Sequence, residues 1–335
     1  MSAISKLAAA LATTAVAAGL AAVAPSASAG TPPALGGCQA FPAYTGTAAA
    51  PSAADQTAWN QDVSSAPKDP RSAKYMNRIR RLGGNQSLHP DFGGGGEYGI
   101  PYEVVTAAQP DVEVDAMAYG DESDFGLAPV PPGADVEGGS DHHVLVVQQG
   151  TPCELFELYR ARFLGAGEAN GWEADSTAYW NLGSAALRPE GWTSADAAGL
   201  PILPGLVRHD EVAAGAVEHA IRATFDTTRR AYIHPATHHA SSRCARALPP
   251  MGLRLRLKRG YYERHLADFE PGSQARPIFE ALYRYGLMVA DNGSNWYFTG
   301  ASDPAWDDDD VGDLKHVPGS AFLVVASQAP VTTPC

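Results

Sequence analysis

Runs of apolar residues along the chain predict a protein built mostly from short strands. Residues 143–149 (HVLVVQQ) form a continuous apolar run, which a turn at residues 150–152 separates from a second β-rich run at 153–162. This pattern is typical of a hairpin whose first strand is buried. Residues 253–258 alternate leucine with arginine or lysine, which predicts a strand with one apolar and one basic face. Further strands are predicted at residues 98–106, 112–119, 172–182, 219–225, 230–234, 296–299 and 321–326.

Helical patterns are fewer. Residues 72–82 begin with a serine suited to N-capping and end at two glycines. Residues 274–285 place apolar side chains on one face and stop at Gly286, and residues 303–315 suggest a short acidic helix. Many short strands with two or three decorating helices predict a mainly β fold, either a β-sandwich, a jelly-roll-like fold or a distorted barrel.

The N-terminus has the pattern of an export signal. Lys6 precedes an apolar run at residues 7–24, and Ala-Ser-Ala at 27–29 fits a cleavage site. We therefore expect a signal peptide at residues 1–29, an Ala/Pro-rich lead-in at 30–57, and a single β-rich domain at 58–335. The expected localisation is secreted, outside the cell.

The net charge of the chain limits the classes of partner that it is expected to bind. The chain carries 24 Lys and Arg against 37 Asp and Glu, a net charge of −13. This balance argues against nucleic acid and against anionic membranes as partners, because both attract basic surfaces. We expect a monomer. The chain contains no G-x-S-x-G, H-E-x-x-H or Walker A motif, so serine-hydrolase, zincin and ATP chemistry are disfavoured.

Four cysteines, an even number in an exported chain, predict two disulfides. Cys38, Cys153, Cys244 and Cys335 allow three pairings. Because chain termini often lie close together, we favour Cys38 with Cys335 and Cys153 with Cys244.

Acidic residues beside predicted strands are the candidate catalytic groups. Asp141 and His143 lie where a polar turn enters the apolar run, so the histidine could orient or tune a carboxylate. Asp196 lies in a loop of small residues, and Asp210 and Glu211 follow a Pro-Gly turn. Each segment has an alternative without a catalytic role. The turn at Asp141 could simply cap backbone N–H groups, and the Asp196 loop could be a helix start with Ser194 as N-cap. Asp210 and Glu211 could form a solvated charge cluster.

Aromatic residues near these carboxylates are candidate binding residues. Trp192 and Trp296 could stack on a sugar ring, with Ser194 and Asp291 binding hydroxyls. The Asn-Gly at 292–293 is also a hairpin-turn signal, which accounts for that segment without a ligand. His234, His238 and His239 could bind a divalent metal from a loop, or could simply be exposed. No cofactor is predicted beyond this metal.

Five segments, residues 59–64, 88–93, 138–143, 191–210 and 285–296, resemble a group of exported bacterial proteins of unassigned activity. The resemblance implies one coherent extracellular domain over most of residues 59–325, and it implies no site residue.

Export, a β-rich scaffold and aromatic residues beside carboxylates favour a glycoside hydrolase that acts on a neutral polysaccharide or oligosaccharide. Such enzymes need two carboxyl groups across the scissile bond, and we expect Asp141 and Asp196, with Asp210 or Glu211 as substitutes. The alternatives are a metal-dependent extracellular hydrolase or oxygenase, a polysaccharide lyase, and a non-catalytic secreted glycan-binding protein.

Overall fold

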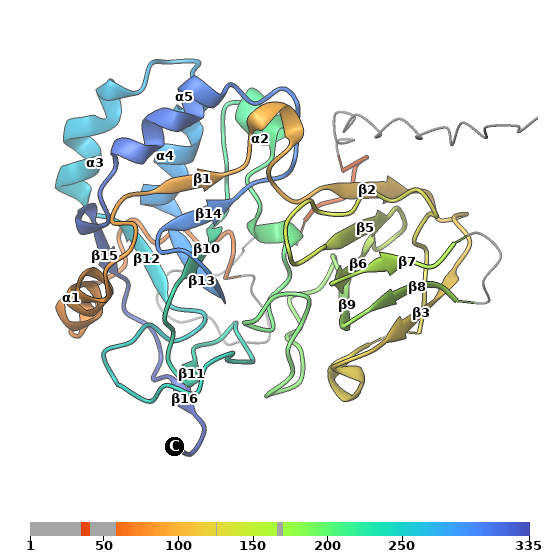
Figure 1. Ribbon diagram of the computed structural model, residues 1–335. Coiled ribbons are helices and arrows are strands. Elements are labelled where there is room, and N and C mark those ends of the chain that lie inside the picture. Colours follow the sequence, from red (N-terminus) through yellow and green to blue (C-terminus); the bar gives the residue numbers. More distant parts are fainter. Residues whose placement is uncertain (1–34, 41–57, 125, 166–169) are drawn as a thin grey trace, which may run out of the picture.

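The computed structural model describes residues 35–40, 58–124, 126–165 and 170–335 (Figure 1). The predicted export signal at residues 1–29 lies outside these ranges, as does most of the lead-in. No helix within the described ranges is long and apolar enough to cross a membrane. The described piece of the lead-in, residues 35–40, is anchored by burial of Leu35 and by a disulfide of Cys38.

A six-stranded mixed sheet forms one half of the molecule (Figure 1). Its order is β1 (His89–Asp91), β14 (Tyr297–Thr299), β10 (Ile221–Phe225), β13 (Leu287–Asn292), β12 (Arg254–Leu257) and β15 (Phe322–Val324). β10 and β13 are parallel, as are β1 and β14, whereas the other neighbours are antiparallel. The apolar pattern predicted all of these strands except β1 and β13.

Helices gather on the side of this sheet that faces away from the other half (Figure 1). They are α1 (Ser72–Leu82), α3 (Arg259–His265), α4 (Ala275–Arg284) and α5 (Asp308–Gly312), and α2 (His209–Ala213) lies nearer the middle. α4 buries Ile278 and Leu282 in the core of the sheet, because they lie four residues apart on one helical face. The helix ends before Gly286, whose φ is +75° and where a Cβ would lie 2.0 Å from the carbonyl oxygen of Leu255.

Short 3₁₀ helices occur at Gly94–Gly96, Gly120–Glu122, Leu203–Gly205, Leu266–Asp268, Asp313–His316 and Gly319–Ala321. The predicted acidic helix at 303–315 is thus shorter than expected and continues as a 3₁₀ helix. In α1, Ser72 is not the N-cap. Its Oγ instead accepts a hydrogen bond of 2.9 Å from the backbone N–H of Val324, which joins α1 to β15.

Two four-stranded sheets form the other half, which we call the sandwich half (Figure 1). One has the order β2 (Tyr102–Val105), β5 (Val144–Gln148), β6 (Glu154–Tyr159), β9 (Ser176–Asn181), and the other β4 (Leu127–Ala128), β3 (Val112–Ala116), β8 (Asn170–Ala174), β7 (Arg162–Phe163). Val144 and Val146 pack against Val114 and Trp172 of the second sheet. Leu145 and Val147 face a separate core on the opposite side, which explains the continuous apolar run.

A two-stranded sheet of β11 (Ala231–Tyr232) and β16 (Val331–Thr332) completes the described structure. Most of the regular structure is therefore strand, in several mixed sheets, and no sheet of the described residues closes into a barrel. The prediction of a mainly β fold is confirmed.

The predicted strand at 172–182 divides into two strands of different sheets. The chain leaves β8 at Ala174 and enters β9 at Ser176, so a single residue, Asp175, connects the two layers. Its backbone N–H donates to the carbonyl of Tyr159 at 2.8 Å. Both layers are apolar inside, so the hydrophobic pattern could not reveal the break.

The predicted Asn-Gly hairpin is wrong. β13 and β14 do not pair with each other, because β10 lies between them. Residues 293–296 pass over the end of β10, where the hydroxyl of Thr224 donates to the carbonyl of Ser294 at 2.7 Å. This crossing places β13 and β14 on opposite sides of the same strand.

The basic face of β12 does not meet solvent, because Arg254 and Arg256 are both buried. Arg254 donates to backbone carbonyls of Ala58, Gln61 and Tyr285. Arg256 donates to the carbonyl of Ala66 at 3.0 Å. The segment that precedes α1 thus covers this strand, and its carbonyls replace water as partners of the guanidinium groups.

The predicted disulfide pairing is wrong as well. Cys38 is bonded to Cys153, and Cys244 is bonded to Cys335. Residues 35–40 pack on the sandwich half near the β5–β6 turn, whereas β16 carries the C-terminus to β11. Because the two ends of the described chain join different halves, Cys38 does not meet Cys335.

We expect peptide mapping of the unreduced protein to recover two linked pairs, Cys38 with Cys153 and Cys244 with Cys335. Replacing Cys38 and Cys153 by serine should lower the free energy of unfolding by about 2–4 kcal/mol, because the bridge closes a long loop. A peptide that links Cys38 to Cys335 would contradict this arrangement.

Candidate functional site

One face of the six-stranded sheet is polar. On β10, the side chains of Ile221, Ala223 and Phe225 enter the helix-side core, and Arg222 and Thr224 alternate with them onto the other face. The strand register aligns their neighbours, because Thr224 pairs with Tyr297, and Asp91 pairs with Thr299. We call this the polar face. It consists of His89, Asp91, Arg222, Thr224, Asp291, Tyr297 and Thr299.

A β-bulge directs Asp291 to this face. Val289 pairs with Ala223 and points into the core, whereas Asp291 pairs with the next residue, Thr224. The side-chain alternation of a regular strand would send residues 289 and 291 to the same side. The extra residue, Ala290, reverses that alternation, so Asp291 approaches Arg222.

Arg222 forms a bidentate ion pair with Asp196 at the buried end of the polar face. Nε and Nη2 of Arg222 each donate to a carboxylate oxygen of Asp196 at 2.9 Å. Nη1 donates to Oγ1 of Thr299 at 2.7 Å. Burial lowers the pKa of Arg222, but the charge and hydrogen bonds of Asp196 outweigh burial and raise it. The pair therefore stays ionised inside the protein.

The loop of Asp196 is fixed to both halves of the molecule. The backbone N–H of Asp196 donates to Oγ of Ser194, whose hydroxyl donates to the carbonyl of Leu200 at 2.6 Å. Ser176 Oγ donates to the Ser194 carbonyl on the sandwich side, and Ala198 N–H donates to the Ala290 carbonyl of β13. This segment is a turn and not the start of a helix.

Asp291 interacts with Arg222 more weakly than Asp196 does. Its Oδ2 lies 3.9 Å from Nη2, and 20% of its side chain is exposed. Burial and the charge of Asp196 raise the pKa of Asp291 to about 7, although Arg222 and the backbone N–H of Asn292 oppose the shift. Because Asp196 already neutralises Arg222, Asp291 is a carboxyl group that holds a proton near neutral pH.

Glu137 is held in the opposite state. Its Oε2 accepts hydrogen bonds from the backbone N–H and Nδ1 of His143, at 3.2 and 2.6 Å. Burial raises the pKa of Glu137, but the bond to His143 and its charge outweigh burial and lower it. His143 Nε2 lies 3.0 Å from the Ala195 carbonyl, so both ring nitrogens face acceptors. Burial lowers the pKa of His143, and the bond to Glu137 more than restores it.

Asp91 is the third carboxyl group here. It is exposed at the end of β1, and the charges of Arg222 and Glu137 both reach it. Partial burial raises its pKa, while His89 and Arg222 oppose that rise. We call Asp91, Glu137, His143, Asp196, Arg222, Asp291 and Thr299 together the Arg222 cluster. It offers partly exposed carboxyl groups in different protonation states around one fixed cation.

Of the residues selected from the sequence, His143, Asp196 and Asp291 meet in this cluster. The carboxylate of Asp196 is wholly buried and paired, so no oxygen is left to meet a substrate. Asp141 lies in the turn before β5, where the hydroxyl of Ser140 donates to it at 3.3 Å. The geometry therefore favours a different pair of carboxyl groups from the one expected.

Asp210 and Glu211 form ion pairs with Arg208 at the start of α2, at 3.2 and 2.7 Å. Glu211 also bonds His219 at 3.1 Å. Both carboxylates thus have structural partners of their own, and a role beside Asp141 or Asp196 gains no support from the geometry.

The prediction of a sugar platform is wrong for Trp296, whereas for Trp192 it stays a prediction. Trp296 is buried against Phe225 and Phe322, with a φ of 65°, so it is a core residue and offers no platform for a sugar. Trp192 is half-buried, and the guanidinium of Arg188 lies 5.6 Å from its ring centre.

The three histidines have separate partners. His234 bonds Glu190 at 2.6 Å, His238 lies 2.8 Å from the Ala197 carbonyl, and His239 bonds Thr333 at 2.9 Å. Across the described residues, no group of three or more His, Cys, Asp or Glu side chains is arranged to hold a metal ion. The possible metal site at these three histidines therefore gains no support from the described structure.

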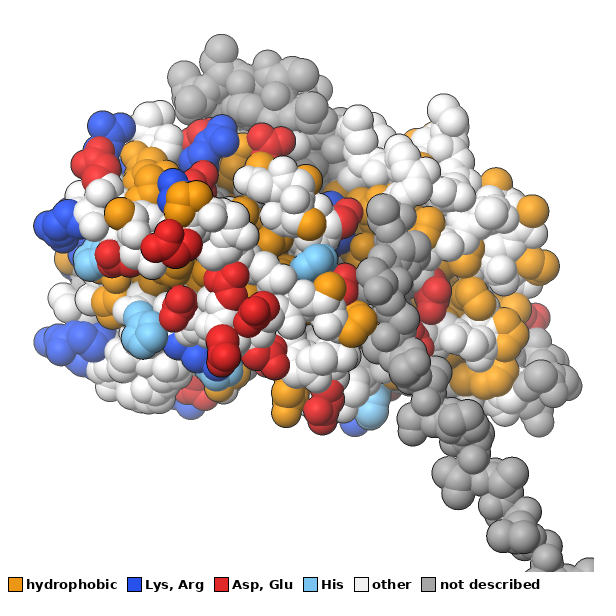
Figure 2. All heavy atoms as spheres, turned by 90° about the horizontal axis from the view of Figure 1, so that it is seen from above, with side chains coloured by type: hydrophobic (Ala, Val, Ile, Leu, Met, Phe, Trp, Pro, Cys, Tyr) orange, Lys and Arg blue, Asp and Glu red, His pale blue; other side chains and the backbone are white. Residues whose placement is uncertain are grey.

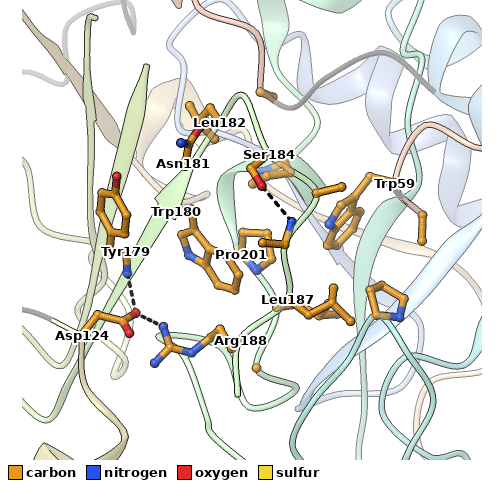
Figure 3. A pocket seen from close by; sticks show the side chains of 18 of the residues that line it. Trp59, Asp124, Tyr179, Trp180, Asn181, Leu182, Ser184, Leu187, Arg188 and Pro201 are labelled. Atoms are coloured by element: carbon orange, nitrogen blue, oxygen red, sulfur yellow. Dashed lines mark hydrogen bonds and ion pairs between the residues drawn. The ribbon is translucent and has the colours of Figure 1, made fainter. Parts of the chain in front are cut away.

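A separate apolar pocket lies beyond the Asp196 loop (Figure 3). It measures about 240 Å³, and its walls include Trp59, Trp180 and Pro201. The ion pair between Arg188 and Asp124 lies at the edge of the pocket, and the two charges neutralise each other. This pocket brings no acid and base together, whereas the Arg222 cluster does.

Sequence reasoning missed Arg222, Glu137, Asp91 and Thr299. A signal existed for Arg222, because a charged residue inside an apolar strand is seldom buried without a partner. Glu137 carries no comparable signal, since only the loop geometry brings it to His143. In comparisons with family models, curated proteins and solved structures, the chain matches no family, no curated protein and no solved structure.

Proposed function

We propose that this protein is a glycoside hydrolase that acts on a neutral oligosaccharide or polysaccharide. One observation carries the proposal. Two partly exposed carboxyl groups lie within reach of the charge of the buried Arg222: Asp291, whose Oδ2 is 3.9 Å from Nη2, and Glu137, which is bonded to His143. In the proposed reaction, Asp291 protonates the leaving oxygen, and Glu137 acts as the base or the nucleophile.

The environments of the two groups suit these roles. Asp291 keeps its proton near neutral pH because burial and Asp196 raise its pKa, and Glu137 stays ionised because His143 donates to it. Glycosidases need one carboxyl group in each state. Asp196 and Arg222 are positioning residues in this scheme, because they fix the charge beside Asp291 without exposing their own polar atoms.

Other features are consistent with action outside the cell. Two disulfides favour an oxidising compartment. The deficit of basic residues favours a neutral substrate over an acidic polymer.

The proposal is tested by incubating the purified protein, from residue 30 onward, with neutral and acidic glycans and measuring product masses. Products that have gained one water are expected from neutral glycans, and their anomeric configuration shows whether Glu137 acts as nucleophile or base. Products lighter by one water would indicate a lyase instead. Binding without products would favour a glycan-binding protein.

We expect kcat/KM to fall about tenfold per pH unit above roughly pH 7, because Asp291 must be protonated to act as the acid. At low pH the fall should begin only below the ordinary glutamate value of 4.5, because the pKa of Glu137 is lowered. Initial rates from pH 3 to pH 9 give the profile. A rate that stays constant through pH 9 would contradict Asp291 as the acid.

A further inference from the structure

An open pocket adjoins the Arg222 cluster. It measures about 450 Å³, within the range of small-molecule sites. β1 supplies His89 and Asp91 to its wall, and α5 and the following 3₁₀ helix supply Asp308 and Lys315. Asp91 belongs to both the pocket and the cluster, and its strand partner Thr299 accepts a hydrogen bond from Arg222. The pocket is therefore contiguous with the proposed reaction centre through Asp91.

An aromatic ring stands at this pocket. Tyr98 is 56% exposed, although large aromatic side chains are usually buried. Its ring lies directly against Gly94, where a Cβ would come within 2.7 Å of Cδ2. An exposed ring supported from behind can present its face to a ligand.

The glycine run at residues 93–96 is explained by the same pocket. All four residues have positive φ, from 62° to 111°, which L-residues with a Cβ rarely adopt. A Cβ on Gly93 would lie 2.2 Å from Oδ1 of Asp308, and the N–H of Gly94 donates to that oxygen at 2.8 Å. The run thus fixes Tyr98 and Asp308 as neighbours on the pocket wall.

The polar groups of the wall favour an uncharged ligand with hydroxyl groups. Asp91 and Asp308 offer acceptors, and the ammonium of Lys315 offers donors. Burial and the charge of Lys315 lower the pKa of His89, whose ring stacks on Tyr297 at 4.0 Å. Acidic side chains gather over α5 (Figure 2), which disfavours a phosphate or another anion in this pocket.

We propose that this pocket is a sugar subsite in which the ring of Tyr98 stacks on a sugar residue next to the scissile bond. The inference rests on the proposed hydrolase function, because it treats the ligand as the neighbouring part of the same substrate. Asp308 and Lys315 bind hydroxyl groups of that residue, and the glycine run holds Tyr98 and Asp308 in place.

The test compares Tyr98→Ala with Tyr98→Phe, which keeps the ring, and uses cellohexaose, laminarihexaose, xylohexaose, mannohexaose and chitohexaose as probes. For the hexasaccharide that is cleaved, Tyr98→Ala should raise KM about tenfold, while kcat stays within about twofold. Tyr98→Phe should match the parent protein. Because Tyr98 is exposed, both variants should melt at the parent temperature.

Titration of the same probes into Asp291→Asn separates the two proposals. Binding that weakens about tenfold on adding Tyr98→Ala supports the subsite, even if no glycan is ever hydrolysed and the hydrolase proposal fails. Hydrolysis with KM and Kd unchanged in Tyr98→Ala overturns the subsite alone. Failure of all five probes to bind overturns the subsite as well.

Discussion

Asp291→Asn is expected to lower kcat for glycan hydrolysis by about 10²–10⁴-fold, the usual contribution of a general acid. Asparagine keeps the shape of the side chain but has no proton to give to a leaving oxygen. Rates on the cleaved glycan, measured at pH 6 where Asp291 is protonated, provide the comparison. Asp111→Asn, an exposed aspartate outside the cluster, is the matched control and should leave kcat unchanged.

The same variant has a second readout that does not depend on activity. The folded-state pKa of Asp291, about 7, lies above its ordinary value of 3.8, so the folded state binds more protons than the unfolded state between these values. The parent protein therefore loses this share of its stability progressively as pH rises from about 4 to about 7. Asp291→Asn does not titrate, and it should gain roughly 1–3 kcal/mol relative to the parent between pH 4 and pH 8.

Two results would contradict this assignment. Full activity in Asp291→Asn together with loss of activity in Asp141→Asn would restore the pair expected from the sequence. An unfolding free energy that changes with pH equally in the parent and in Asp291→Asn would show that Asp291 does not titrate near neutrality.

Arg222→Met is expected to destabilise the protein by about 3–5 kcal/mol, because it leaves the buried carboxylate of Asp196 without its cation. Asp196→Asn should be similarly harmful for the opposite reason. In the double variant neither charge remains, so its destabilisation should be smaller than the sum of the two single effects. Urea denaturation of the four proteins at pH 7 gives the coupling energy.

The chain offers a matched control for this cycle. Arg160 and Asp175 form an ion pair at 3.2 Å, but their side chains are 57% and 27% exposed. The same cycle on this pair should give a coupling below about 1 kcal/mol, since water screens it. A coupling at Arg222–Asp196 no larger than that of the control would contradict the role of the buried pair.

The sequence predicted those elements whose own pattern is sufficient. The continuous apolar run at 143–149 predicted β5, because a strand buried on both faces leaves no polar position. The spacing of Ile278 and Leu282, with Gly286 after them, predicted α4 and its end. These signals are local, so neighbouring segments did not alter them.

Local signals were misleading where a distant segment supplied the partner. Arg254 and Arg256 predicted a basic face, yet the segment at residues 58–66 covers that face and its carbonyls accept from both arginines. Asn292 and Gly293 suggested a hairpin, yet β10 lies between the two strands. The cysteines suggested paired termini, yet each end joins a different half.

By itself, the sequence determined the mainly β character, the principal helices, and the presence of His143, Asp196 and Asp291 among the candidate residues. Only the tertiary structure decided that Asp196 is the buried partner of Arg222, and that Asp291 and Glu137 are the partly exposed carboxyl groups. The physical reason is that protonation and exposure depend on neighbours far away in the chain. A bulge at Ala290, a crossing over β10 and a loop shared by both halves bring those neighbours together.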